Sequence, residues 1–155
     1  ASDVYKRQVN RDTLSVIVRK TKKINVSQIA ESYRKICKEI NGYIDNLKMQ
    51  GKTVAIWGAS HQGFTLASTA HLEEKISYII DSAPFKQGKY APASHIPIVS
   101  PAYAVNNPVD AIIIMAPGYT EEIASIIYEK FGKNIEIAVM MAKDLQMYED
   151  IKKCQ

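Results

Sequence analysis

Four short apolar runs constrain the fold of this chain more than any other feature of its sequence. They are KTVAIW at 52–57, ISYII at 76–80, DAIIIM at 110–115 and IEIAV at 135–139. Each has the length and the β-branched content of a strand, and the nearly continuous apolar character indicates burial on both faces. Because helical patterns separate the runs, the sequence predicts an α/β fold: a Rossmann-like, doubly wound, mainly parallel sheet with helices on both faces.

Helical patterns occupy the segments between these runs. A long amphipathic helix is expected over 26–49, where apolar residues recur at steps of three and four and Ser27 is placed as its N-cap. Further helices are expected over 64–71 and 120–131. Thr120 is predicted to be the N-cap of the last one. The long helix therefore precedes the first strand of the sheet, and Gly51 ends it.

The length and composition indicate one folded domain. A chain of 155 residues with 46% hydrophobic residues is long enough to bury one core. Residues 1–12 show no periodicity, and we expect a disordered leader or a cloning scar there. Residues 13–155 are then a single domain, with a short strand at 14–18 and a last strand at 135–139.

The charge distribution and the cysteines exclude several classes of function. The net charge is +4, but residues 1–23 hold seven basic and two acidic residues, so the remaining body is close to neutral. We therefore expect no nucleic acid partner, and no apolar run reaches the length of a membrane span. Cys37 and Cys154 lie far apart without a metal-ligand pattern, so no metal site is expected. These features predict a cytoplasmic protein without a membrane partner.

A glycine-containing turn directly after the first apolar run is the first candidate site. In a doubly wound sheet this turn lies at the carboxyl ends of the strands, where backbone amides and a helix N-terminus favour an anion. A triphosphate-binding loop is excluded because Phe64 stands where that motif has its lysine, and a nucleophile elbow because Ser60 lacks the following glycine. The candidate substrate-binding residues here are Gly58, Ala59, Ser60, His61, Gln62 and Gly63.

A long polar segment after the second apolar run supplies the other candidates. Asp81 follows Gly58 by 23 residues, the place where an acid holds a ribose hydroxyl in dinucleotide-binding folds. Long loops at this edge of a sheet commonly carry function. Lysines can hold a diphosphate, a tyrosine can stack on a base, and a histidine can donate to a hydroxyl or phosphate. The candidates are Asp81, Lys86, Gln87, Gly88, Tyr90 and His95.

These residues leave several interpretations open. The glycines can simply permit a tight turn and helix packing, and the lysines, Tyr90 and His95 can be structural or surface residues. A second hypothesis is an NAD(P)-binding or other nucleotide-binding domain of an oxidoreductase or regulatory protein that uses Asp81. Ser60 counts against it, because it replaces the central glycine of the dinucleotide fingerprint. A third is an interaction module in which the helix over 27–49 packs on a partner.

The order of motifs resembles the C-terminal domain of the sugar C-methyltransferase family. The resemblance covers roughly residues 13–150. It combines the pattern G-A-x-x-x-G with a later D-x-x-P-x-K-Q-G-x-Y-x-P-x-x-H-I-P-I-x-x-P. The matching residues are Gly58, Ala59, Gly63, Asp81, Pro84, Lys86, Gln87, Gly88, Tyr90, Pro92, His95, Ile96, Pro97, Ile98 and Pro101.

The resemblance implies a specific function. Enzymes of this family transfer a methyl group from S-adenosylmethionine to a carbon of a nucleotide-linked deoxysugar. Their C-terminal domain helps to anchor the nucleotide diphosphate sugar, while zinc, the methyl donor and the acid/base residues belong to two other parts. We therefore expect part of a transferase that is not catalytically complete alone. It would be either a domain of a longer methyltransferase, whose missing methyltransferase domain is its partner, or a free-standing relative that binds without catalysis.

Two positions depart from the family pattern. The family commonly has a lysine before the second glycine of the turn, where this chain has Gln62. After the strand at 110–115 the chain reads APGYTEEI, where the family commonly has a tryptophan and an asparagine. The first change removes a cation near the phosphates and the second alters the wall of the pocket. We expect no cofactor to be bound by this domain itself.

Overall fold

A computed structural model describes residues 4–8, 14–18 and 27–153 of the chain. The chain divides into two compact units, Ala1–Ala30 and Glu31–Gln155. In the first unit, β1 (Val4–Gln8) pairs antiparallel with β2 (Leu14–Val18), so the predicted strand at 14–18 is confirmed. Of the expected leader at residues 1–12, the structure describes strand β1. The absence of periodicity in this segment did not predict that strand or its pairing with β2. The other leader residues and Cys154 lie outside the described residues.

The second unit contains a six-stranded sheet in the order β5-β4-β3-β6-β7-β8. Its first five strands in this order run parallel, and only β8 is antiparallel to its neighbour β7. The predicted mainly parallel sheet is therefore confirmed. The chain moves outward from β3 to β5 and then returns to the other side of β3 as β6. The bounds are β3 (Val54–Trp57), β4 (Ile79–Ile80), β5 (Ile98–Val99), β6 (Ala111–Ile114), β7 (Glu136–Met140) and β8 (Leu145–Met147).

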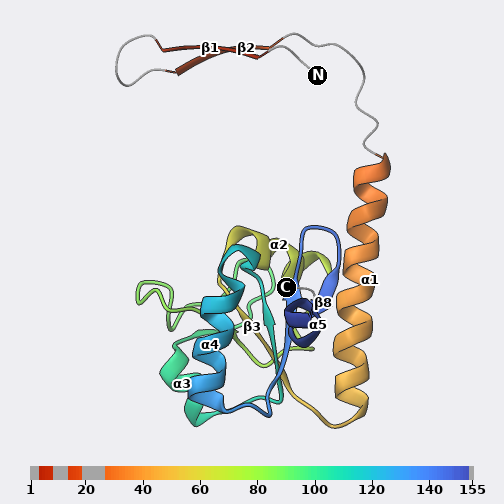
Figure 1. The fold of residues 1–155 in the computed structure, drawn as a ribbon, viewed down its shortest axis with the longest axis vertical. Helices are drawn as coiled ribbons and strands as arrows, with labels where there is room; N and C mark the ends of the chain where they lie inside the picture. The colour runs from red at the N-terminus through yellow and green to blue at the C-terminus, as the bar shows by residue number, and fades with distance from the viewer. Residues whose placement is uncertain (1–3, 9–13, 19–26, 154–155) are drawn as a thin grey trace. The chain divides into compact units, whose positions relative to one another are not determined.

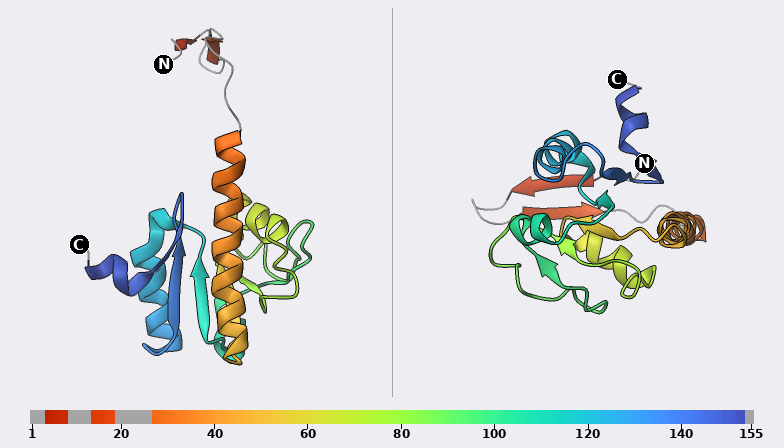
Figure 2. Two further views of the ribbon diagram at one scale, coloured as in Figure 1. Left: turned by 90° about the vertical axis from the view of Figure 1, so that its right-hand side faces the viewer. Right: turned by 90° about the horizontal axis from the view of Figure 1, so that it is seen from below.

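Helices cover both faces of this sheet (Figures 1 and 2). Side chains alternate along each strand, so Ile56 packs into one core with α1 and α2, and Trp57 packs into the other with α3, α4 and α5. The buried residues of the first core are aliphatic apart from methionine, while the second core also contains Trp57, Tyr78 and Tyr148. Burial on both faces explains the continuous apolar runs of the sequence. The bounds are α1 (Ser27–Met49), α2 (His61–Thr69), α3 (Pro101–Asn106), η1 (Pro117–Tyr119), α4 (Thr120–Phe131) and α5 (Tyr148–Lys153).

The structure corrects three details of the sequence analysis. Thr120 is not the N-cap of α4, because the short helix η1 precedes it and the Thr120 hydroxyl donates to the carbonyl of Pro117 at 2.9 Å. Strand β7 is not the last, because β8 adds to the edge of the sheet. Helix α2 begins at His61 rather than at residue 64, since Ser60 already caps it.

Three tyrosines anchor helices and loops through partly buried hydroxyl groups. Tyr43 donates to a carboxylate oxygen of Glu136 at 2.9 Å, Tyr78 to the carbonyl of Asn107 at 2.5 Å, and Tyr148 to Glu121 at 2.7 Å. Each bond requires the neutral phenol. Burial raises the pKa of Tyr78 to about 12 and, together with the bond to Glu121, the pKa of Tyr148 to about 12. Burial also raises the pKa of Tyr43 far above its ordinary value.

These pKa values predict a loss of stability at alkaline pH. The folded chain keeps phenol protons that the unfolded chain releases above pH 10.0. The stabilisation is complete below about pH 10 and falls as the pH rises to about 12, by about 2–3 kcal/mol for Tyr78. Urea unfolding followed by circular dichroism at several pH values measures this slope. Tyr78→Phe should flatten it, and an unchanged slope in this variant would contradict the assignment.

Candidate functional site

The turn between β3 and α2 requires both of its glycines. Gly58 has a backbone φ of +116°, a conformation that other residues rarely adopt. A Cβ atom at Gly63 would lie 2.7 Å from the carbonyl oxygen of Gly58, closer than real contacts allow. The turn therefore closes tightly at the carboxyl end of β3, the point from which the sheet extends in both directions.

The start of α2 presents unpaired backbone donors at this edge. The Ser60 hydroxyl accepts from the N–H of Gly63 at 3.1 Å, and the Ser60 carbonyl accepts from the N–H of Phe64 at 2.8 Å. Within the described residues, the N–H groups of Ser60, His61 and Gln62 have no acceptor. Such groups, at the positive end of a helix dipole, favour an anion.

Asp81 and Lys86 form an ion pair that holds the glycine turn against the following loop, and we call it the Asp81–Lys86 clasp. The Lys86 ammonium donates to Asp81 at 3.1 Å and to the carbonyl of Ala59 at 2.8 Å. The same carboxylate accepts from the N–H of Ala59 at 2.8 Å and from that of Ala83 at 2.8 Å. Since only 13% of the Asp81 side chain is exposed, its charge serves this internal contact.

The remaining candidates of the long loop lie farther along the sheet edge. Gln87 continues the clasp by donating to the carbonyl of Asp81 at 3.0 Å. Gly88, at φ +74°, pairs with β5, and Tyr90 is exposed and forms an isolated bridge with Pro97. Gly88 and Tyr90 line a different pocket, beside α3, from the one that His61 and Gln62 line.

His95 closes a turn within the loop. Its N–H donates to the carbonyl of Ala91 at 3.0 Å, its φ is +53°, and its side chain is exposed. The neighbouring Pro92 and Ala93 line a shallow pocket together with His61. The structure therefore joins the turn, Asp81, Lys86 and Gln87 through hydrogen bonds, and it places Gly88, Tyr90 and His95 outside this network.

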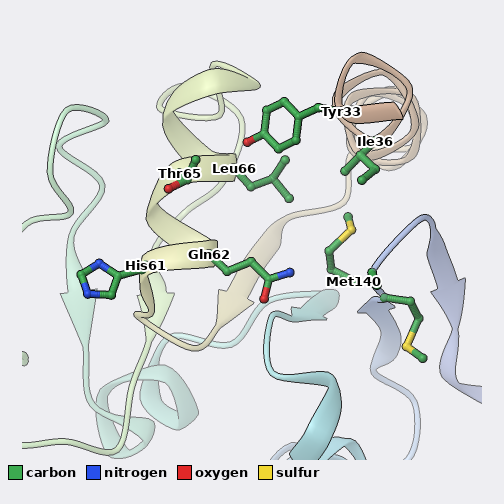
Figure 3. A pocket seen from close by; sticks show the side chains of 9 residues that line it. Tyr33, Ile36, His61, Gln62, Thr65, Leu66 and Met140 are labelled. Atoms are coloured by element: carbon green, nitrogen blue, oxygen red, sulfur yellow. The ribbon is translucent and has the colours of Figure 1, made fainter. Parts of the chain in front are cut away.

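A pocket of about 360 Å³ opens between α1, α2 and the end of β7, and we call it the α1–α2 pocket (Figure 3). Its walls are mostly apolar side chains, while Gln62 and His61 belong to the first turn of α2. Of the lining residues, only these two belong to the glycine-containing turn that the sequence indicated as a candidate site. The lining residues are Tyr33, Ile36, His61, Gln62, Thr65, Leu66, Met140, Met141 and Ala142.

A second pocket, of about 370 Å³, lies at the start of α4, and we call it the α4 pocket. Met141 lines both pockets, because it follows β7 at the carboxyl edge. Most of the α4 pocket is formed by the segment APGYTEEI, which departs from the family pattern. This departure is the one sequence feature that drew attention to this part of the chain. Its lining residues are Pro117, Gly118, Tyr119, Thr120, Glu121, Glu122, Met141 and Ile151.

Metal ligation and membrane insertion find no support in the described part of the chain. Among these residues no group of three or more His, Cys, Asp or Glu side chains is placed to hold a metal ion. None of the helices described here is long and apolar enough to cross a membrane. The arrangement offers backbone donors and apolar pockets, which suit the binding of a small molecule.

Comparison with known proteins gives three results. The sequence profile of the C-methyltransferase C-terminal domain matches residues 13–140. C-methyltransferase NovU from Streptomyces niveus is 32% identical over 97 residues, which are 62% of this chain and 23% of that protein's length. The crystal structure of UDP-D-quinovosamine 4-dehydrogenase from Vibrio fischeri is 19% identical, with a TM-score of 0.46, and covers 66% of this chain and 84% of its own.

The contact between the two glycines predicts an asymmetric effect of glycine substitutions. Gly63→Ala should destabilise the fold by about 1–3 kcal/mol, because its methyl group meets the Gly58 carbonyl. Gly42→Ala in α1 is the control, since no atom lies within 4 Å of its added Cβ. It should stabilise the helix by about 0.5–1 kcal/mol. Denaturant unfolding of both variants measures the difference, and equal effects would refute the proposed steric contact.

The Asp81–Lys86 clasp predicts a local effect on amide exchange. Asp81→Asn removes the charge that holds the Ala59 N–H, so hydrogen exchange at Ala59 should accelerate about tenfold or more. Asp110→Asn is the matched control, because Asp110 accepts from the N–H of Thr53 at 2.7 Å at the opposite end of the strands. It should accelerate exchange at Thr53 and leave Ala59 unchanged. Slow exchange at Ala59 in Asp81→Asn would show that the clasp does not hold the turn.

Proposed function

This chain belongs to the C-methyltransferase C-terminal domain family, and on that premise we propose that it binds the nucleotide sugar for a C-methyltransferase dependent on S-adenosylmethionine. The substrate of this proposal is a nucleotide-linked deoxysugar. The observation that carries the proposal is the set of unpaired N–H groups at the start of α2, beside an open pocket at the carboxyl edge of the sheet. Ligands of open α/β sheets bind at this edge, where the strand order reverses.

The diphosphate is the part of the ligand that the α2 N-terminus would receive. The N–H groups of Ser60, His61 and Gln62 are hydrogen-bond donors fixed by the backbone, so they can bind phosphate oxygens without a flexible Lys or Arg side chain. Lys86 lies nearby, but its ammonium already contacts Ala59 and Asp81. We therefore assign Lys86 to positioning the turn, and the backbone donors to binding the phosphates.

The chemistry of methyl transfer belongs, in this proposal, to another part of the polypeptide. The chain spans less than a quarter of the length of the curated relative it matches. S-adenosylmethionine would supply the electrophilic methyl group there, and the described residues hold no cluster suited to the zinc that the family implies. The role of this domain is then to fix the nucleotide end of the substrate, so that the sugar carbon is presented to the methyl donor.

The geometry favours this function over a dinucleotide-binding oxidoreductase or regulatory domain. A ribose-binding acid must present a free carboxylate oxygen to the ligand. Both oxygens of Asp81 instead accept hydrogen bonds from the chain itself, and its side chain is largely buried beside Lys86. Use of Asp81 for NAD would require the clasp to open.

Calorimetric titration tests the proposed ligand. A thymidine diphosphate deoxysugar should bind, while NAD and S-adenosylmethionine, titrated in parallel, should not. Lys86→Ala should weaken binding about tenfold, or by about 1.4 kcal/mol, because the turn loses its support. Lys89→Ala is the control, since the exposed Lys89 side chain has no partner among the described residues, and it should bind as the unchanged chain does.

Three outcomes of this titration would contradict the proposed ligand or the role assigned to Lys86. Binding of NAD without the nucleotide sugar would favour the dinucleotide hypothesis and make Asp81 the next residue to substitute. Binding of S-adenosylmethionine by this chain alone would contradict the proposal, which assigns the methyl donor to another part of the polypeptide. Equal losses in Lys86→Ala and Lys89→Ala would indicate a general effect of charge rather than support of the turn.

A further inference from the structure

We infer that the α1–α2 pocket is the subsite for the base of the nucleotide. This inference rests on the proposed function, because it assigns one part of that ligand to one part of the site. The pocket's volume of about 360 Å³ lies in the range of small-molecule sites. It lies directly beside the start of α2, where the diphosphate is proposed to bind.

The walls of the pocket suit a flat, uncharged ring. Leu66 and Met140 are buried and contribute apolar surface from α2 and β7, and Ile36 adds to it from α1. Figure 3 shows these side chains facing a common space from different elements. Methionine is flexible and polarisable, so it adapts to the face of an aromatic ring.

Tyr33 is held in place at the side of the same pocket. Its hydroxyl lies 2.7 Å from the hydroxyl of Thr69, which itself donates to the carbonyl of Thr65 at 2.7 Å. The Thr69 proton is therefore used, and Tyr33 is the donor in its bond with Thr69. This contact between α1 and α2 fixes the tyrosine ring before any ligand binds, which reduces the entropy cost of binding.

Gln62 supplies the polar contact that a base needs. Its amide carries a donor and an acceptor side by side, the pattern that pairs with the edge of a base. Figure 3 shows its side chain extending from α2 toward Met140, and among the described residues it has no hydrogen-bond partner. No Lys, Arg, Asp or Glu lines the pocket, so it favours the uncharged base over the charged diphosphate.

The two subsites share the first turn of α2. His61 and Gln62 have backbone N–H groups without an acceptor at the proposed diphosphate site, and the Gln62 side chain extends toward the pocket (Figure 3). A base and a diphosphate joined by one pentose therefore have neighbouring places to bind. This assignment differs from the sequence expectation that Tyr90 stacks on a base, because Tyr90 lines a separate pocket beside α3.

Methionine methyl spectroscopy tests the location of the base. The chain has five methionines, and the methyl groups of Met140 and Met141 should shift on addition of thymidine diphosphate through the ring current of the base. Met49 is 81% exposed and lines neither pocket, so its methyl signal is the internal control and should not move. Inorganic pyrophosphate, which has no ring, should leave Met140 and Met141 nearly unshifted.

A variant that fills the pocket tests its contribution to affinity. Thr65 is exposed on α2 and lines the pocket, so Thr65→Phe should occupy the base subsite without disturbing the core. Affinity for thymidine diphosphate should fall at least tenfold, and affinity for pyrophosphate should stay the same. Lys35→Phe is the control, because Lys35 lies on α1 outside the pocket and is 70% exposed, and it should bind both ligands as before.

The outcomes separate this inference from the proposed function. If the unchanged chain binds thymidine diphosphate but neither the methionine signals nor the Thr65→Phe affinity change, the base lies elsewhere and the proposed function still stands. Failure of the unchanged chain to bind any nucleoside diphosphate or its sugar would end both. Equal losses of thymidine diphosphate and pyrophosphate in Thr65→Phe would also overturn the inference, since the pocket would then not act on the base alone.

Discussion

The carboxylate of Asp81 is the contact on which the candidate site depends. It joins the turn after β3 to the loop after β4 by accepting the Ala59 N–H, and Lys86 completes the clasp from the loop. Without this carboxylate, the two loops would be joined by the hydrogen bond from Lys86 to the Ala59 carbonyl and by the backbone pairing of β3 with β4, a strand of two residues. Partial burial of an ion pair costs desolvation, and the four hydrogen bonds of the Asp81 carboxylate and the Lys86 ammonium offset this cost.

The clasp is also consistent with the proposal that backbone N–H groups, rather than a free lysine, would bind the diphosphate. Lys86 pairs with Asp81 and holds the turn closed. The closed turn leaves the N–H groups of Ser60, His61 and Gln62 without an acceptor among the described residues. Donors fixed in this way need no reorganisation when the ligand arrives. The family pattern commonly has a lysine at the position of Gln62. In this chain the backbone N–H groups at the N-terminus of α2, rather than a side chain, would supply the positive charge at this position.

The sequence predicted those features that arise from local pattern and failed where tertiary contacts decide. The continuous apolar runs gave the parallel sheet, and Gly58 with Gly63 gave the tight turn, because both follow from burial and backbone sterics. The partners of Asp81 were not predictable. An acidic residue at the end of a strand gives the same sequence pattern whether its carboxylate binds a ribose hydroxyl or pairs with Lys86. Tyr33 and Met141 come from segments 108 residues apart, so no spacing rule indicated that one pocket unites them. The antiparallel β8 was missed because LQM is short and only half-buried.

The shared position of Met141 has a consequence for the two pockets at the carboxyl edge. One flexible side chain forms part of the wall of both the α1–α2 pocket and the α4 pocket. A ligand that pushes Met141 out of one pocket changes the space left in the other. If both pockets bind ligands, their affinities would be coupled through Met141, and thermodynamic reciprocity would require each occupant to alter the affinity for the other by the same factor. One methionine would then act as a mechanical link between the two faces of the sheet.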